Sequence, residues 1–215
     1  MKRTLSLAVL ISGNGSNLQA IIDAIEAGEL QAEIRLVISN VGDAFGLERA
    51  RRHSLEARVL DHREFADREA FDTALAQALD AVEPDFVVLA GFMRILGAGL
   101  VERYQHRILN IHPSLLPNYK GLDTYQRALD HGETRHGVSI HLVTAALDDG
   151  PVLLQGSYPI EADDGVEQMA AKGHALEHRM YPAILGWLAE GRLTIDRGQA
   201  YYDQVHLQSP IQFSA

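Results

Sequence analysis

The chain has 215 residues, of which 47% are hydrophobic, so it is long enough to bury a sizeable core and most naturally forms one domain. Its formal net charge of −10 argues against duplex nucleic acid as the main partner, because phosphate backbones are bound by clustered lysine and arginine. The chain contains no cysteine, which excludes a disulfide framework, a thiolate nucleophile and thiolate metal sites.

Hydrophobic runs and helical patterns alternate in the first half of the chain, as in βαβ units around a parallel sheet. In chain order, strands are expected at 5–11, 34–38, 57–60, 86–90 and from 108 onward, and helices at 18–25, 45–53 and 71–82. Ser16 or Asn17 is placed to cap the first helix, and Gly28 is placed to end it. Pro84 ends the helix before the fourth strand.

The second half of the chain does not continue the alternation of strands and helices seen in the first half. Strands are expected at 138–143 and 152–158, and the link "TAALDDGP" is too short for a helical crossover, so the two strands form an antiparallel hairpin. A long helix is expected at 166–188, with a break or kink near Pro182, and the last twenty residues give no clear pattern. The predicted fold class is α/β: a single domain with a Rossmann-like, open, mainly parallel twisted sheet flanked by helices and an antiparallel hairpin in the C-terminal half.

The start of the chain only superficially resembles a signal peptide. Met1-Lys2-Arg3 precedes a hydrophobic run that is short and passes into "SGNGSN" without a convincing cleavage site. No segment approaches the ~20 apolar residues of a membrane span. We therefore expect a cytoplasmic protein with no membrane partner.

Three loops are expected at one edge of the sheet, because ligands of open parallel sheets bind outside the carboxyl ends of the strands. They are "SGNGSN" (12–17), "GFMRIL" (91–96) and "NIHPSLLP" (110–117). The first joins a strand to a helix start, where free backbone N–H groups attract a phosphate. Leu18 stands where a dinucleotide fingerprint needs its third glycine and Ser39-Asn40 replaces an acidic ribose ligand, so NAD is disfavoured. The alternative to a phosphate site is that "SGNGSN" is a tight turn that binds no ligand.

Asn110 and His112 share one face of the fifth strand if the period of two holds. Asn110 can donate a hydrogen bond to a developing oxyanion, and His112 can exchange a proton or stabilise that oxyanion when charged. Asp148 in "LDDG" can orient or charge His112, or take a proton through water. A polar turn at Asp148 and a satisfied buried histidine are the structural alternatives.

Two other constellations are disfavoured. His174 and His178 are spaced as a helical metal pair, but Ala175 stands where a zincin needs glutamate, so no metal is expected. Ser114 with His112 and Asp148 lacks the elbow sequence of a serine hydrolase.

Together, "LISGNGSNLQAII", "PDFVVLAGFMRIL", "NIHPSLLPNYKGL" and "LDDGPVLLQ" resemble the glycinamide ribonucleotide formyltransferases of purine biosynthesis. The resemblance runs in order from Leu5 to the helix before Gly191. It implies transfer of a formyl group from 10-formyltetrahydrofolate, the donor co-substrate, to the amine of glycinamide ribonucleotide, with neither metal nor NAD. It also implies a single formyltransferase domain over 1–215, with a phosphate-binding half at about 1–100, a folate and catalytic half at about 101–195, and a tail at 196–215.

The resemblance assigns roles to the residues that match its motifs. The catalytic residues are Asn110, His112 and Asp148; the ribonucleotide contacts are Gly15, Ser16, Asn17 and Glu177; the folate contacts are Arg68, Met93, Arg94, Ile95, Leu96 and again Asn110. Arg68 and Arg94 can bind the glutamate carboxylates of the folate. The implied partners are these two small molecules, without nucleic acid, and the protein is a monomer or a homodimer.

One departure stands out, because the family commonly shows "GLHTH" where this chain has "GLDTY". Asp123 adds negative charge that can alter the pKa of His112 or a folate contact, and Lys120 can partly offset it. Formyltetrahydrofolate deformylase and methionyl-tRNA formyltransferase are disfavoured by length, since each carries a further domain. A non-catalytic phosphoribosyl-binding module remains the alternative from a different class.

Overall fold

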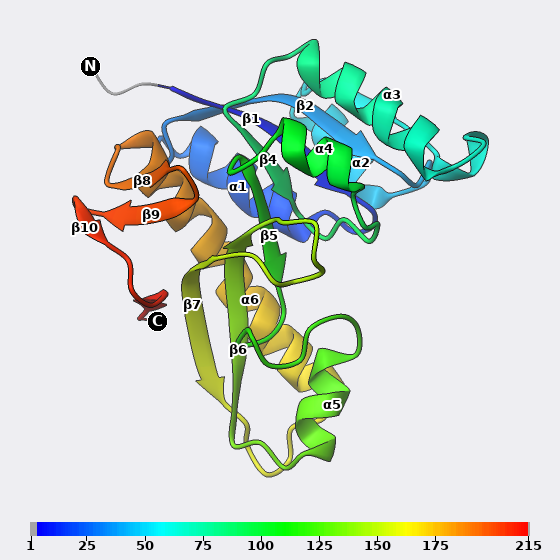
Figure 1. Cartoon of the computed structure of the whole chain (residues 1–215). Coiled ribbons are helices and arrows are strands. Elements are labelled where there is room, and N and C mark those ends of the chain that lie inside the picture. The colour runs from blue at the N-terminus through cyan, green and yellow to red at the C-terminus, as the bar shows by residue number, and fades with distance from the viewer. Residues whose placement is uncertain (1–3, 215) are drawn as a thin grey trace.

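The structure is a computed structural model, and it describes residues 4–214 (Figure 1). The basic start, Met1-Lys2-Arg3, lies outside the described residues. The hydrophobic run that follows it is strand β1 (Leu5–Ile11), and every one of its residues is buried in the sheet. No helix in the range 4–214 has the length and apolar character needed to span a membrane.

A single sheet runs through both halves of the chain. Within the described residues its strands follow the order β11-β7-β6-β5-β4-β1-β2-β3. Their bounds are β2 (Ala32–Ser39), β3 (Ala57–Val59), β4 (Phe86–Leu89), β5 (Ile108–His112), β6 (Arg135–Leu142), β7 (Val152–Pro159) and β11 (Ile211–Phe213). Strands β3, β2, β1, β4 and β5 are mutually parallel, whereas β6 is antiparallel to both β5 and β7. The predicted α/β class and the β6–β7 hairpin are therefore confirmed.

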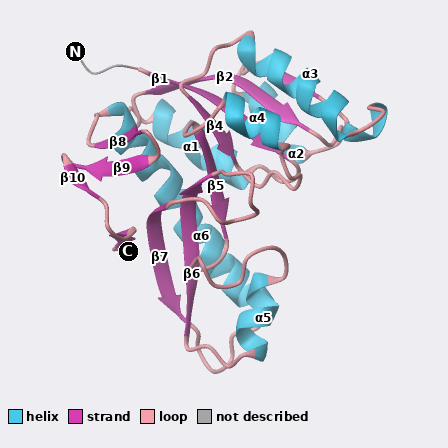
Figure 2. Cartoon of the chain, viewed as in Figure 1, coloured by secondary structure: helices cyan, strands magenta, loops and turns pink. Residues whose placement is uncertain are grey.

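Helices cover both faces of this sheet (Figures 1 and 2). Alternate residues of β1 point to opposite sides: Leu7, Val9 and Ile11 join a core with α1 (Ser16–Glu26), α2 (Phe45–Arg52) and α6 (Val166–Ala189). Ala8 and Leu10 join a second core with α3 (Arg68–Asp80) and α4 (Ala98–Arg103). Burial on both faces explains why the parallel strands are continuous hydrophobic runs in the sequence.

Helix α6 crosses the molecule and differs from the prediction at Pro182. The sequence suggested a break or kink there; a break is wrong, because the helix continues through Pro182 to Ala189. The helix packs along α1 and against β6 and β7, so tertiary burial of its hydrophobic face outweighs the one hydrogen bond that proline cannot donate.

Residues 193–213, most of which gave no clear pattern in the sequence, form small strands. Strands β8 (Leu193–Asp196), β9 (Gln199–Tyr202) and β10 (Val205–His206) make a separate antiparallel sheet, and β11 adds to β7 at the edge of the main sheet. Two short helices, α4 and α5 (Thr124–Asp130), and a 3-10 turn at His62–Glu64 were also missed.

Tyr181 joins α6 to the sheet. Its side chain is fully buried, and its hydroxyl donates to the carbonyl of Leu89, 2.6 Å away at the end of β4. Replacing Tyr181 with phenylalanine removes this donor from a buried site, so we expect the free energy of unfolding to fall by about 1–3 kcal/mol. Chemical denaturation measures the loss. Tyr201→Phe, which removes an exposed hydroxyl paired with Gln199, is the matched control and should stay within about 0.5 kcal/mol of the parent.

Candidate active site

The three predicted loops meet at one edge of the sheet. Strands β1, β4 and β5 are neighbours, so their carboxyl ends lie side by side. The amide of Ser12 donates to the carbonyl of Gly91 over 3.1 Å, and the amide of Met93 donates to the hydroxyl of Ser12 over 2.8 Å. The prediction that these loops share an edge is therefore confirmed.

The glycine turn leads into α1 differently from the prediction. The N-cap is Gly15, in the left-handed region with φ 72°, and no side chain among residues 4–214 caps the helix, so the expected cap at Ser16 or Asn17 is wrong. Both residues are already helical, because the left-handed turn at Gly15 starts the helix one residue earlier. The first N–H groups of the helix have no intrahelical partner, and they form the positive end of the helix dipole. The turn is therefore suited to bind an anion.

Arg49 of α2 braces this turn. Its guanidinium donates to the backbone carbonyl of Asn14 over 2.9 Å, to the Asn14 side chain over 3.0 Å and to Gln19 over 3.2 Å. The turn also packs directly on α2, since a Cβ at Gly15 would lie 2.6 Å from the Cα of Gly46. The shape of the turn is thus held from outside the βα unit, by contacts that the sequence pattern did not reveal.

Replacing Arg49 with methionine should weaken binding of inorganic phosphate or of a phosphate monoester by about tenfold, which corresponds to roughly 1.4 kcal/mol. The variant loses two hydrogen bonds to Asn14 in the turn, one to Gln19 on α1, and one positive charge beside the turn. Isothermal titration measures the affinity. Arg52→Met is the matched control, because Arg52 lies on the same helix and pairs with Glu48 instead; an equal loss in both variants would point to general charge and not to the brace.

Asn110, His112 and Asp148 come together at the end of β5. His112 Nδ1 lies 3.5 Å from an Asp148 carboxylate oxygen, and the side chains of both residues are only 7% exposed. Asn110 and His112 alternate along β5, with one residue between them. Asp148 arrives from the loop between β6 and β7, and its carboxylate accepts a hydrogen bond of 2.9 Å from the amide of Gly121.

Burial and the neighbouring acceptors shift the pKa of His112 in opposite directions. Burial lowers the pKa below the ordinary value, whereas the Tyr119 carbonyl, 2.9 Å from Nε2, and the Asp148 carboxylate raise it, with burial the stronger. The pKa of Asp148 is raised by burial and lowered more strongly by His141, by the Gly121 amide and by His112. Near neutral pH, the arrangement therefore combines an ionised Asp148 with a mainly neutral His112 whose two acceptors favour protonation.

His141 is a member of this cluster that the sequence reading missed. It is almost completely buried on β6, its Nε2 lies 3.1 Å from the Asn110 side-chain nitrogen and 3.6 Å from Asp148, and its Nδ1 lies 2.9 Å from the carbonyl of Leu142. With the Nδ1 proton donated to that carbonyl, Nε2 accepts from the Asn110 amide and fixes its orientation. The antiparallel pairing of β5 with β6 sets Asn110 opposite His141, and that register was the available signal.

The loop after β5 closes over Asp148. Lys120 pairs with Asp149, the exposed neighbour of Asp148. Asp123 is exposed at the start of α5, in the left-handed region with φ 56°. The charged groups with the largest effects on the pKa of His112 are Asp148, His141 and Arg127, and Asp123 is not among them.

Glu177 connects α6 to the anion-binding turn. Its carboxylate accepts a hydrogen bond of 2.8 Å from the Asn17 side chain, and both residues are buried. Burial raises the pKa of Glu177, while Asn17 and His174 oppose the rise. Helix α6 thus places the Glu177 carboxylate against Asn17, at the start of α1. The residues that the resemblance assigned to the ribonucleotide therefore lie together.

The segment after β4 borders Asn110, since Leu89 pairs with Asn110 in the sheet. Met93 and Ile95 are 70% and 53% exposed, whereas Leu96 is buried, so the segment presents apolar side chains to solvent beside the site. Arg68 of α3 donates to the Leu96 carbonyl over 2.5 Å. Arg94 lies over the ring of Phe71, 4.6 Å from its centroid, and its Nε has no hydrogen-bond partner in the described chain. Exposed apolar groups beside two arginines suit a flat ligand with carboxylates.

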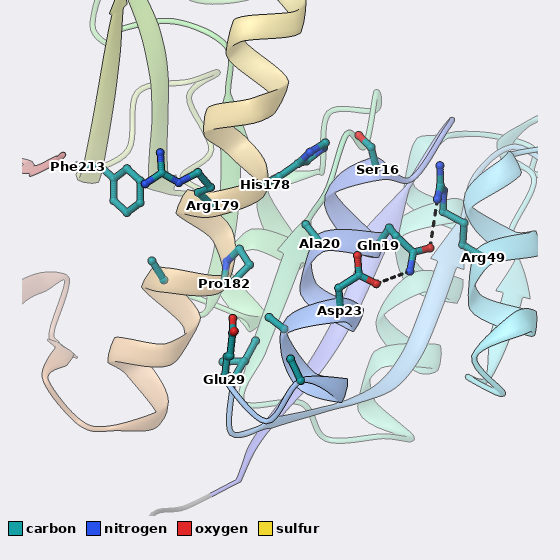
Figure 3. A pocket seen from close by; sticks show the side chains of 14 residues that line it. Ser16, Gln19, Ala20, Asp23, Glu29, Arg49, His178, Arg179, Pro182 and Phe213 are labelled. Atoms are coloured by element: carbon teal, nitrogen blue, oxygen red, sulfur yellow. Dashed lines mark hydrogen bonds between the residues drawn. The ribbon is translucent and has the colours of Figure 1, made fainter. Parts of the chain in front are cut away.

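A cavity of about 850 Å³ lies between α1 and α6 and reaches the anion-binding turn at Ser16 (Figure 3). Ser16, Arg49 and His178 lie at its upper end in this view and Glu29 at its lower end, and neither Asn110 nor His112 lines it. His174 and His178 stack on α6, but residues 4–214 contain no group of three metal-ligating side chains. The Ser114 hydroxyl is buried and donates to the Asn118 carbonyl over 2.6 Å, so it is committed to the loop.

Known proteins resemble this chain over most of its length. The family model described as formyl transferase matches residues 5–185. The chain is 48% identical over 199 residues to phosphoribosylglycinamide formyltransferase of Escherichia coli (strain K12), covering 93% of this chain and 94% of that protein. It is 39% identical over 194 residues to the trifunctional purine biosynthetic protein adenosine-3 of Homo sapiens, covering 90% of this chain and 19% of that longer protein.

Solved structures of similar proteins have the same fold as this chain. The phosphoribosylglycinamide formyltransferase of Coxiella burnetii, determined in complex with CHES, superposes with a TM-score of 0.94 at 48% identity over 99% of this chain and all of the other. Glycinamide ribonucleotide transformylase 1 of Symbiobacterium toebii superposes with a TM-score of 0.88 at 43% identity over 93% of this chain and 94% of that one.

Proposed function

Because the chain belongs to the formyl transferase family, among the phosphoribosylglycinamide formyltransferases, we propose that its cluster of Asn110, His112 and Asp148 transfers a formyl group. The donor is 10-formyltetrahydrofolate and the acceptor is the amine of glycinamide ribonucleotide. The reaction belongs to purine biosynthesis. The observation that carries the proposal is the meeting of the three side chains at the carboxyl end of β5, where Asp148 lies 3.5 Å from His112.

The acceptor is held by the anion-binding turn. The first N–H groups of α1, at Ser16 and Asn17 after the Gly15 turn, bind its phosphate. Glu177, fixed by Asn17, contacts its ribose. This arrangement suits an acidic protein, because the anion is bound by a local concentration of N–H donors and not by overall charge.

The folate is held by the segment after β4. Met93, Ile95 and Leu96 contact its ring system, and Arg68 and Arg94 bind its carboxylates. Asn110 lies between this segment and the acceptor, so it contacts the formyl oxygen.

In the chemical step, the amine nitrogen bonds to the formyl carbon, and the bond from that carbon to folate N10 breaks. Negative charge develops on the formyl oxygen, and the Asn110 amide and the His112 imidazole donate to it. His112 Nε2 contacts the Tyr119 carbonyl at 2.9 Å, and we propose that the formyl oxygen replaces this carbonyl as the acceptor during the reaction. Asp148 favours the charged imidazole and relays the amine proton through water toward N10.

A spectroscopic folate assay, run with and without glycinamide ribonucleotide, tests this proposal. We expect consumption of 10-formyltetrahydrofolate only when the acceptor is present. Consumption without the acceptor would indicate a deformylase, and binding of the ribonucleotide without any folate turnover would indicate a phosphoribosyl-binding module.

A further inference from the structure

Tyr125, where this chain departs from the sequence common in the family, reaches from α5 to α6. Its hydroxyl lies against Gly173, and a Cβ built at Gly173 would lie 2.5 Å from that oxygen. This is closer than any real contact of that kind, so the hydroxyl occupies the space that a side chain at 173 would fill. Tyr125 and Gly173 are therefore a complementary pair.

The hydroxyl of Tyr125 contacts α6 one helical turn from Glu177. Gly173 and Glu177 are four residues apart on α6 and share one face of the helix. The pKa of Tyr125 is raised first by burial and then by the negative charge of Glu177, which agrees with this placement. Glu177 is in turn bonded to Asn17 at the anion-binding turn. The hydroxyl thus contacts α6 one turn before a carboxylate that is hydrogen-bonded to the anion-binding turn.

The ring of Tyr125 is fixed by packing, whereas its hydroxyl is not fixed by a hydrogen bond within residues 4–214. The ring packs edge-on against buried His136, with 5.4 Å between the ring centroids. Across the described part of the chain, the hydroxyl makes no hydrogen bond to another residue. A half-buried donor that is fixed by its ring and unpaired at its tip is suited to meet a ligand.

We propose that the Tyr125 hydroxyl is a further specificity-determining contact, which forms a hydrogen bond with a ribose hydroxyl of the acceptor beside Glu177. This inference rests on the proposed function only in that the acceptor carries a phosphorylated ribose. A carboxylate repels phosphate but accepts hydrogen bonds from hydroxyl groups, so an acceptor whose phosphate binds at the start of α1 directs its ribose hydroxyls toward Glu177. The Tyr125 hydroxyl reaches α6 one turn before Glu177, from the side of α5.

The packing of the pair is tested first, by stability alone. Gly173→Ala should be destabilising, because its methyl group meets the Tyr125 hydroxyl. Tyr125→Phe removes that oxygen, so Gly173→Ala should cost much less in the Tyr125→Phe background. Thermal melts of the four proteins measure the coupling, and equal costs in the two backgrounds would show that the hydroxyl does not contact Gly173.

The ligand contact is tested by binding of methyl ribofuranoside 5-phosphate and of its 2-deoxy and 3-deoxy counterparts. Tyr125→Phe should weaken binding of the ribo form by about tenfold, as loss of one hydrogen bond predicts. The substitution should have little effect on the deoxy form that lacks the contacted hydroxyl, and none on inorganic phosphate. NMR titration follows these affinities without any turnover. Tyr201→Phe on β9, which is remote from α5 in the fold, is the matched control.

The same variant in the transfer assay should raise the KM for glycinamide ribonucleotide about tenfold without changing the KM for the folate. Equal binding of the ribo form by Tyr125→Phe and the parent overturns the inference, whatever the transfer assay gives. Loss of ribose binding in a protein that transfers no formyl group would support the contact at Tyr125 and contradict the proposed function.

Discussion

Replacing His112 with alanine is expected to lower turnover at least about 100-fold, the scale of a group that stabilises an oxyanion or exchanges a proton. In the described chain, the His112 imidazole is the only side chain that contacts both the Tyr119 carbonyl and Asp148. Its ordinary pKa lies near neutrality. Single-turnover rates with saturating folate and acceptor isolate the chemical step from binding.

His112 is 6% exposed, so its removal leaves a cavity, and loss of activity must be separated from loss of folding. His112→Gln keeps most of the volume and provides a second variant, with circular dichroism and melting as the folding check. His106→Ala is the matched control, because His106 precedes the same strand at its opposite end. Near-normal turnover in both folded His112 variants would remove His112 from the mechanism.

Replacing Asp148 with asparagine is expected to lower turnover by a similar factor of at least about 100. Asparagine keeps the size and the acceptor for the Gly121 amide but loses the charge that favours the imidazolium form of His112. Asp149→Asn is the matched control, since Asp149 is exposed and pairs with Lys120. Equal losses at the two positions would point to the loop and not to the catalytic carboxylate.

The pH dependence gives a second measure of Asp148. The carboxylate raises the pKa of His112 against the larger effect of burial, so its removal lowers the pKa of His112 further. NMR titration of the His112 ring in Asp148→Asn should therefore move to lower pH than in the parent, and in Asp149→Asn it should stay in place. An unchanged or upward shift in Asp148→Asn would contradict the electrostatic role.

The sequence predicted the sheet well because its strands are buried on both faces. Continuous hydrophobic runs mark β1, β2, β4 and β5, and the carboxyl-end rule then locates the site without coordinates. The chemistry of Asn110 and His112 also follows from the period of two in one strand. These inferences need only local pattern and one topological rule.

What the sequence did not reveal depends on contacts between distant segments. The position of His141 beside Asn110 requires the register of β5 against β6, and the brace of Arg49 on Asn14 requires the packing of two helices. Tyr125 is recognised only when Gly173 is seen to leave room for it. Short elements such as α4 and α5 lack the length over which a hydrophobic period can be read.

The pairing of β5 with β6 also limits how this protein can be recombined. Asn110 and His141 face one another only in the observed register, and a slip of one residue would turn either strand's side chains to the opposite face. Chimeras that exchange the β6–β7 hairpin between relatives should therefore keep the residue count within β6 from Arg135 to His141. Crossovers that add or remove a single residue inside this part of the strand are expected to yield inactive proteins even when every active-site residue is retained.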